Sequence, residues 1–309
     1  MPHYAFFDGK FVPLAEAKVG IMTHALNYGT ACFEGIRGNW NADHEMMYLF
    51  LVRDHYKRLL RSCNVLKIDV PYTIEELCRL TVELVAMNGY KEDIYVRPLA
   101  YKSSEEVGVK LHGLEDSLCM FCTPFGPYLD VTKGIKCCVS SWRRIDDNMI
   151  PARAKVTGLY VNSALAKTEA IENGYDEGIM LTHDGHVSEG SGENLFLVID
   201  GTLVTPPSSD NILMGITRGT VIKLAREELG IETTERTIDR SELYTADECF
   251  LTGTAAHVTP VAEIDGRKVG NGQVGEISKR LQAIYFDIIQ GKNKKYMDWC
   301  TPVHNMATV

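Results

Sequence analysis

Residues 187–201 read VSEGSGENLFLVIDG. A Gly-Ser-Gly turn at 190–192 leads into a strand-like apolar run from Asn194 to Ile199, and an Asp-Gly pair follows at 200–201. An Asp-Gly pair between apolar or alternating runs is a strong signal for a tight antiparallel hairpin. The sequence therefore predicts much antiparallel sheet, because the same pair recurs at 8–9, 184–185 and 265–266.

Helices are predicted between these strands. Apolar residues recur at helical spacing over 56–63, and Thr73-x-x-Glu76 is a capping box that opens a helix ending at Gly89. Further helices are expected over 159–173, 217–229 and 276–290. Strands are expected over 94–101, 117–123, 135–142, 178–182, 194–199 and 248–252. The predicted fold class is α+β.

A segment rich in turn-forming residues divides the chain. Between Cys122 and Lys133 the sequence TPFGPYLDVT places two prolines and a glycine between two strand-like runs. This pattern predicts an interdomain linker at 123–132. The linker separates a small α+β domain over 1–122 from a larger domain over 133–309, and both have ordinary domain sizes.

Composition excludes several classes of protein. The chain has 309 residues, of which 45% are hydrophobic and 24% charged, so disorder and fibres are excluded. Its net charge is −9 and no Lys/Arg cluster is dense, so no nucleic-acid partner is expected. There is no signal-peptide pattern at the start and no apolar run of about 18 residues, so neither export nor membrane insertion is expected.

The nine cysteines are predicted to be reduced thiols in a cytoplasmic protein, because their number is odd and their spacing forms no framework. Cys119 and Cys122 share one strand-like run, which points their side chains to opposite faces. No second pair is present to complete a tetrahedral zinc site, and no metal site is predicted.

Two ionisable residues are candidates for chemistry. Lys155 lies in RAKVTGLY (153–160), among small and apolar residues at the start of a helix. It is either a solvated lysine, the commoner case, or a Schiff-base lysine whose amine is made nucleophilic by desolvation. Glu189 precedes the Gly-Ser-Gly turn, which is either a plain loop or a place where a carboxylate holds the ring nitrogen of a pyridine cofactor protonated.

Two segments offer backbone N–H groups to an anion. MGITR (214–218) opens a helix, so Thr217 is either a simple N-cap or part of a phosphate site. LTGTAA (251–256) ends a second strand with several amides. The GxGxxG match at 270–275 is rejected as a dinucleotide site, because only a short hairpin arm precedes it and no βαβ unit is present.

Six motifs, in order along nearly the whole chain, resemble the branched-chain amino-acid aminotransferases, which are pyridoxal 5'-phosphate enzymes of fold type IV. They are THALNYGTACFEGIRG (23–38), IYVRPLAY (94–101), RAKVTGLY (153–160), VSEGSGENLF (187–196), MGITR (214–218) and LTGTAAHVTPV (251–261). The resemblance implies a two-domain fold like that of D-amino-acid aminotransferase, with 133–309 as the large cofactor-binding domain.

The resemblance also implies roles for individual residues. Lys155 corresponds to the Schiff-base lysine that shuttles the proton, and Glu189 to the partner of the pyridinium nitrogen. The other implied cofactor contacts are Arg58, Tyr160, Ile216, Thr217 and Thr254. The implied substrate contacts are Tyr28, Phe33, Gly35, Tyr95, Arg97, Val109, Tyr128 and Ala255.

Within this set, Tyr95 and the Thr254 and Ala255 amides are expected to bind the α-carboxylate. Arg97 and Tyr28 are expected to receive the side-chain carboxylate of glutamate. Tyr95 and Arg97 are two residues apart on a predicted strand, so their side chains should share one face.

The implied activity is reversible amino transfer between L-leucine, L-isoleucine or L-valine and 2-oxoglutarate by a ping-pong mechanism, which yields L-glutamate and 2-oxo acids. A homodimer or larger homo-oligomer is implied, with residues 106–109 as the loop that reaches the partner. Leu159 and the pair Val156-Thr157 depart from the family pattern and leave the substrate range open.

Three related activities would also keep Lys155 and Glu189: D-amino-acid aminotransferase, (R)-amine transaminase and aminodeoxychorismate lyase. The segment YVRP at 95–98 favours the branched-chain group. A metabolite-binding protein without turnover is a further alternative, from a different functional class.

Overall fold

The computed structural model describes residues 3–126, 129 and 132–304. The chain divides into two compact units, each of which is described by itself. Unit 1 comprises residues 1–126, 154–158 and 287–309, and unit 2 comprises residues 127–153 and 159–286. The predicted domains 1–122 and 133–309, with a linker at 123–132, stay a prediction; that division placed 154–158 and 287–309 with the C-terminal domain.

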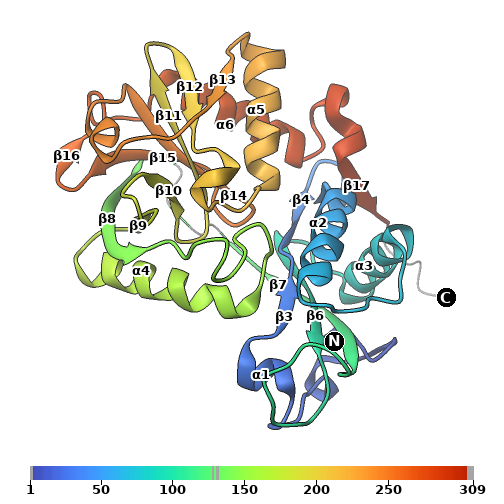
Figure 1. The fold of residues 1–309 in the computed structure, drawn as a ribbon. Coiled ribbons are helices and arrows are strands. Elements are labelled where there is room, and N and C mark those ends of the chain that lie inside the picture. Colours follow the sequence, from blue (N-terminus) through green and yellow to red (C-terminus); the bar gives the residue numbers. More distant parts are fainter. Residues whose placement is uncertain (1–2, 127–128, 130–131, 305–309) are drawn as a thin grey trace. The chain divides into compact units, whose positions relative to one another are not determined.

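Unit 1 contains an antiparallel sheet with the strand order β17-β5-β4-β6-β7-β1-β2, and β3 pairs with β6. Figure 1 labels β3, β4, β6, β7 and β17 of this sheet. Helices α2 and α3 pack together and contact strands β1, β3 and β7. The strands are β1 (Tyr4–Phe7), β2 (Lys10–Pro13), β3 (Ala31–Phe33), β4 (Ile36–Asn41), β5 (Met46–Phe50), β6 (Ile94–Lys102), β7 (Asp116–Pro124) and β17 (Cys300–Val303). The helices are η1 (Leu14–Glu16), α1 (His24–Tyr28), α2 (Val52–Val65), α3 (Ile74–Asn88) and η5 (Lys294–Trp299).

Unit 2 contains a mixed sheet with the strand order β10-β9-β8-β15-β14-β11-β12-β13, and β16 pairs with β15. The β8–β9, β8–β15 and β12–β13 pairs are parallel. The strands are β8 (Ile135–Arg143), β9 (Glu177–Leu181), β10 (Val187–Gly190), β11 (Asn194–Ile199), β12 (Thr202–Thr205), β13 (Thr233–Glu235), β14 (Glu248–Gly253), β15 (His257–Ile264) and β16 (Arg267–Lys268). The helices are η2 (Thr157–Leu159), which begins in unit 1, η3 (Ser208–Asp210), η4 (Arg240–Tyr244), α4 (Tyr160–Glu172), α5 (Ile216–Leu229) and α6 (Glu276–Ile289), whose last three residues belong to unit 1.

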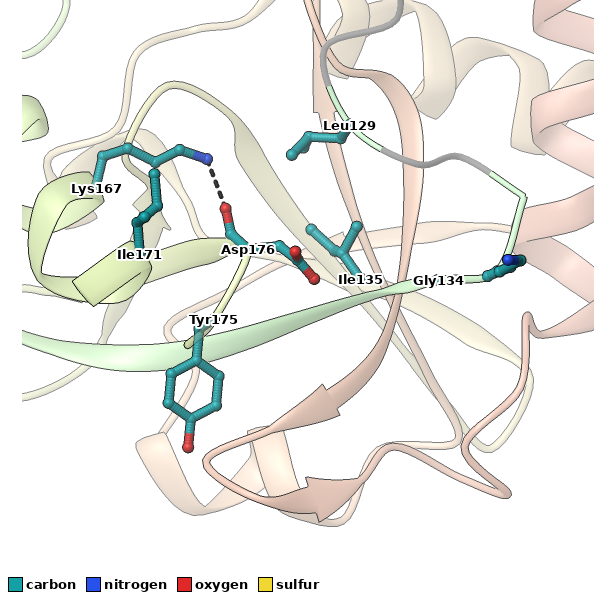
Figure 2. Close-up of a pocket in the computed structure, with 8 residues that line it drawn as sticks. Leu129, Gly134, Ile135, Lys167, Ile171, Tyr175 and Asp176 are labelled. Carbon is teal, nitrogen blue, oxygen red and sulfur yellow. Dashed lines mark hydrogen bonds between the residues drawn. The ribbon is translucent and has the colours of Figure 1, made fainter. Parts of the chain in front are cut away.

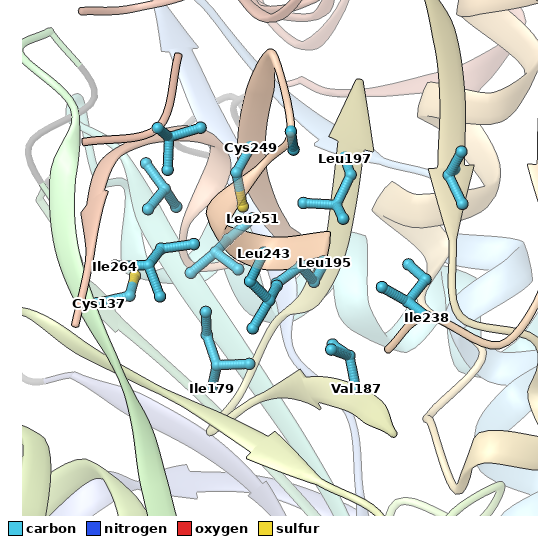
Figure 3. Close-up of a cluster of buried hydrophobic side chains, with 14 of the residues drawn as sticks. Cys137, Ile179, Val187, Leu195, Leu197, Ile238, Leu243, Cys249, Leu251 and Ile264 are labelled. Carbon is cyan, nitrogen blue, oxygen red and sulfur yellow. The ribbon is translucent and has the colours of Figure 1, made fainter. Parts of the chain in front are cut away.

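The core of unit 2 is a cluster of aliphatic and thiol side chains from several of these strands (Figure 3). Ile179, Leu195 and Leu251 are fully buried there, and Leu243 is contributed by the short helix η4. Cys137 and Cys249 belong to the same cluster, and burial raises their pKa values well above the usual range. These thiols therefore act as small apolar core residues.

The predicted α+β class is confirmed, and so are the predicted hairpins. At Asp200-Gly201 both residues have positive φ, 49° and 75°, which is the conformation that a two-residue turn between β11 and β12 requires. The Asp8-Gly9 and Asp265-Gly266 pairs turn in the same way. At 184–185 only Gly185 has positive φ, at 92°, and the turn connects β9 to β10.

The predicted capping box of α3 is also present. Thr73 Oγ1 accepts a hydrogen bond from the Glu76 amide at 3.2 Å, and Glu76 Oε2 accepts one from the Thr73 amide at 2.7 Å. The helix ends at Gly89, whose φ is 61°. Within the described residues no helix is long and apolar enough to cross a membrane.

Candidate active site

In unit 1, β6 carries the two residues that the sequence placed on one face. Burial alternates along this strand, with Ile94 and Val96 fully buried in the core and Tyr95 and Arg97 half-buried on the opposite face. Arg97 Nη2 donates a hydrogen bond to Tyr95 Oη at 3.1 Å. Arg97 Nε is buried, and no described residue accepts its hydrogen bond.

Phe33 and Gly35 approach this pair closely. The Arg97 Cζ atom lies 4.4 Å from the centroid of the Phe33 ring. A Cβ atom at Gly35 would overlap the Tyr95 hydroxyl, so only glycine lets the tyrosine approach this backbone. Four of the predicted substrate residues therefore come together in unit 1.

Lys155 joins the same group. Its carbonyl accepts a hydrogen bond from the Phe33 amide at 3.0 Å, and its own amide donates to Ser62 Oγ at 3.0 Å. The half-buried side chain places Nζ 4.9 Å from the centroid of the Phe33 ring. The Phe33 ring is thus in contact with both the predicted catalytic amine and the predicted substrate arginine.

Arg58 is held by a buried acid in unit 1. Its Nε and Nη2 atoms donate to Glu34 Oε1 and Oε2 at 2.7 and 2.8 Å. Burial opposes ionisation of Glu34, but the charge and hydrogen bonds of Arg58, together with His55, outweigh it and lower the pKa of Glu34 to about 2. Burial lowers the pKa of His55, although its hydrogen bond to Glu34 opposes this shift.

Tyr28 and Val109 lie on α1 and in the 106–110 loop of unit 1. Tyr28 ends α1, and its hydroxyl accepts a hydrogen bond from the Gly108 amide at 3.2 Å. His24 Nε2 lies 2.7 Å from the Gly108 carbonyl oxygen, so α1 and the 106–110 loop are tied together. Val109 is 92% exposed.

In unit 2, Glu189 is a buried carboxylate with several donors. Its Oε1 atom lies 2.8 Å from Arg144 Nη2. Its Oε2 atom accepts hydrogen bonds from Asn194 Nδ2 at 2.9 Å and from the Leu213 amide at 3.0 Å. These contacts fix the orientation of the carboxylate.

The N-terminus of α5 is connected to the same carboxylate. Asn194 Nδ2 also donates to the Leu213 carbonyl at 2.8 Å, and a Cβ at the N-cap Gly215 would overlap Asn194 Oδ1. The Ile216 and Thr217 amides donate to no described residue, and no side chain caps the helix. Such an end is suited to bind an anion.

Thr254 and Ala255 form the turn between β14 and β15. Their amides also donate to no described residue, and both residues are half-buried. Tyr160 is the first residue of α4 in unit 2. The predicted substrate residue Tyr128 lies outside the described residues.

Sequence reasoning missed four residues that position the predicted ones: Glu34 and His55 in unit 1, and Arg144 and Asn194 in unit 2. Glu34 and Asn194 stand inside quoted motifs, but nothing in the motifs indicates their partners. Arg144 and His55 carry no local signal, because only the fold brings them to Glu189 and Glu34.

Unit 2 also has an open cavity of about 610 Å³ beside α4 and β8 (Figure 2). Ile135, Ile171 and Tyr175 contribute to its lining, and Lys167 Nζ donates to the Asp176 carbonyl at 2.6 Å. No predicted site residue among those described lines this cavity. Across the described residues, no group of His, Cys, Asp and Glu side chains is arranged to hold a metal ion.

Comparison with known proteins identifies the family of the chain. The model of the family "Amino-transferase class IV" matches residues 31–264. The chain is 52% identical over 302 residues to a probable branched-chain-amino-acid aminotransferase of Aquifex aeolicus, covering 98% of this chain and 97% of that one.

Two solved structures are similar over nearly their whole length. The branched-chain aminotransferase of Thermoproteus uzoniensis with norvaline is 49% identical, with a TM-score of 0.94 and coverage of 98% of this chain and 100% of that one. The branched-chain amino acid aminotransferase of Thermobaculum terrenum in its PLP-form (holo-form) is 39% identical, with a TM-score of 0.93 and coverage of 98% and 99%. The chain is therefore an aminotransferase and belongs to the class IV amino-transferase family.

Proposed function

We propose that this enzyme transfers amino groups between branched-chain L-amino acids and 2-oxoglutarate with pyridoxal 5'-phosphate as cofactor. One observation carries the substrate assignment: Phe33 contacts both Arg97 and Lys155, and Arg97 is hydrogen-bonded to Tyr95. An apolar ring and a cationic donor thus lie beside the predicted catalytic amine. This pairing suits a pocket that accepts an aliphatic side chain in one half-reaction and a carboxylate in the other.

The residues present fit the proposed cofactor. The Ile216 and Thr217 amides at the start of α5, which donate to no described residue, are suited to hold a phosphate together with Thr254, and Arg58 supplies a positive charge for it. Glu189, fixed by Arg144 and Asn194, would hold a proton at the ring nitrogen. When bound, pyridoxal phosphate would supply an electron sink for the negative charge that develops at the substrate α-carbon.

The chain's own residues would carry the proton transfers and the orientation. The Lys155 amine would remove the proton from the substrate α-carbon and deliver it to the cofactor's carbon. Tyr160 would hydrogen-bond the ring oxygen of the cofactor. Tyr95 and the Thr254 and Ala255 amides would bind the substrate α-carboxylate.

The dual specificity would depend on Arg97. Its buried Nε has no acceptor among the described residues, and the side-chain carboxylate of glutamate would supply one. Tyr28 would assist this contact. Phe33, Gly35, Tyr28, Tyr128 and Tyr160 would form the apolar wall for leucine, isoleucine or valine.

The test is visible absorption of the purified protein loaded with pyridoxal phosphate. We expect absorption that bleaches with L-leucine and recovers with 2-oxoglutarate. Bleaching with D-alanine or an (R)-amine, and not with L-leucine, would move the function to another member of the fold. A protein that cannot be loaded at all would refute the role of Lys155.

The same assay tests Arg97. In Arg97→Ala, turnover with glutamate or 2-oxoglutarate should fall about ten- to a hundredfold more than turnover with leucine, because a hydrogen bond to a charged group contributes about 1.5–3 kcal/mol. Arg53→Ala, which removes an exposed arginine paired with Glu75, serves as the control and should change neither rate. Equal losses with both substrates in Arg97→Ala would contradict the dual pocket.

We also propose that the enzyme is cytoplasmic and assembles as a homodimer or larger homo-oligomer. All nine cysteines are free thiols, as expected in a reducing compartment. The exposed apolar side chains of unit 1, described below, support the assembly.

A further inference from the structure

We propose that Glu34 is a positioning residue that orients Arg58 for the cofactor phosphate. The inference rests on the proposed function, because Arg58 is assigned to the phosphate there. It concerns a residue that makes no contact of its own with cofactor or substrate in the proposed site and acts only through the arginine.

The contact between Glu34 and Arg58 has the geometry of a fixed pair. Both carboxylate oxygens are used, each by one N–H of the same guanidinium edge, at 2.7 and 2.8 Å. Two parallel hydrogen bonds fix the plane of the guanidinium as well as its distance. The Glu34 side chain is fully buried, whereas that of Arg58 is 12% exposed, so the arginine reaches outward from a buried anchor.

The anchor itself is held on two further sides. The Glu34 amide donates to the Pro98 carbonyl at 3.0 Å, which ties the residue to β6. His55 Nδ1 lies 2.7 Å from Glu34 Oε2. Since an ionised carboxylate only accepts hydrogen bonds, the ring donates its Nδ1–H to Glu34. Glu34 therefore has little freedom to follow a moving arginine.

Glu34 has two opposite effects on phosphate binding. Its negative charge repels a phosphate dianion, which weakens binding. Its hydrogen bonds immobilise the long Arg58 side chain before the phosphate binds. This strengthens binding, because less conformational entropy of the arginine is lost when the phosphate binds. A positioning role requires the second effect to be the larger. The two effects are distinguished by whether the Kd for pyridoxal phosphate rises or falls when Glu34 is replaced.

The experiment compares two cofactor forms on the full-length protein after cofactor removal. Pyridoxal phosphate and pyridoxal, which lacks the phosphate, are titrated against wild type, Glu34→Gln and Glu34→Asp, with binding followed by absorption. We expect the Kd for pyridoxal phosphate to rise about tenfold in both variants and the Kd for pyridoxal to change less than twofold. Glu34→Asp keeps the charge and shortens the reach, so it isolates position from charge and also serves if Glu34→Gln does not fold.

A double-mutant cycle with Arg58→Ala tests the path through the arginine. In that background Glu34→Gln should not weaken pyridoxal phosphate binding further. Asp116→Asn, which removes another largely buried carboxylate of unit 1, paired with Lys102 at 2.8 Å, is the control for loss of an ion pair and should leave both Kd values unchanged.

The inference is overturned if Glu34→Gln binds pyridoxal phosphate as tightly as wild type or more tightly, or if pyridoxal binding weakens equally. In both cases the wild-type protein still binds the cofactor, and the proposed function stands. A wild-type protein that binds neither compound would instead overturn the proposed function, and the inference with it.

Discussion

Glu189 and Glu193 are buried carboxylates four residues apart, and the charged groups around them differ. Arg144 pairs with Glu189 at 2.8 Å, whereas Glu193 accepts the Gly192 amide at 3.1 Å and has no cation in ion-pair contact among the described residues. Burial raises the pKa of Glu193 to about 8, and the charge of Glu177 adds to the shift. Lys167, which pairs with Glu177, opposes it. Near pH 7 Glu193 therefore keeps its proton.

This difference predicts a pH-dependent stability. Between about pH 4.5 and about 8 the folded protein holds the Glu193 proton and the unfolded chain does not. The free energy of unfolding therefore falls as pH rises through this window, by up to about 1.4 kcal/mol per pH unit from this one group. Glu193→Gln should remove that slope in urea denaturation measured from pH 5 to 8.

Glu232→Gln is the matched control, because Glu232 is exposed in the same unit and its loss should leave the slope as in wild type. A Glu193→Gln variant with the wild-type slope would contradict a protonated Glu193. Glu193 also packs against Gly253, directly before Thr254, which is proposed to hold the cofactor phosphate.

At the scale of single elements, the start of α5 is built around a glycine. Gly215 has φ −65° and ψ 137°, a conformation open to any residue, so its backbone is not the reason for glycine. The reason is space: Asn194 Oδ1 occupies the position of a Cβ atom. The helix N-terminus and the Glu189 carboxylate are thus joined through one asparagine.

We predict that Gly215→Ala lowers the free energy of unfolding by about 1–3 kcal/mol, because the new methyl group displaces Asn194 from buried hydrogen bonds. Gly219→Ala is the control in the same helix, where a Cβ atom meets nothing within 4 Å. It should stabilise the protein by about 0.5–1 kcal/mol through helix propensity. Chemical denaturation of both variants checks this, and equal effects would rule out the proposed crowding.

At the scale of the whole molecule, unit 1 exposes apolar side chains on α1, the turn before it and the 106–110 loop. Ile21 is 86% exposed, Leu26 62%, Val107 83% and Val109 92%. Hydrogen bonds between Gly108 and the side chains of His24 and Tyr28 join these segments. Apolar side chains gathered in this way favour contact with another protein surface, and a second copy of the chain fits the proposed assembly.

We therefore expect a dimer or larger assembly in light scattering coupled to size-exclusion chromatography. Replacing both Val107 and Val109 by Asp should shift the protein to the monomer, because two buried charges would be left unpaired in the interface. Ile171→Asp, at a 57% exposed position in unit 2, should leave the assembly unchanged. A monomeric wild type, or an assembly that is insensitive to the Val107 and Val109 changes, would contradict this surface as the interface.

Features that depend on neighbours in the chain could be predicted from the sequence. The Asp200-Gly201 hairpin and the Thr73 capping box are correct because turn and cap preferences are set by a few adjacent residues. The predicted α+β class and family are also confirmed. They could be predicted because each motif that indicates them is a short, contiguous stretch of sequence. The roles of the individual site residues stay proposals.

The tertiary structure alone decided what lies next to these motifs. Residues 300–303 pair with 47–50, and the segment around Lys155 pairs with β3, although more than 100 residues separate the partners in both cases. The parallel pairs β8–β9 and β12–β13 and the partners Glu34–Arg58 and Arg144–Glu189 were likewise not foreseen. Such pairings depend on the packing free energy of the whole chain, and the local periodicity of the sequence does not reveal them. The sequence by itself thus determined the local turns, the caps and the family, and the fold decided which charges hold the predicted site residues in place.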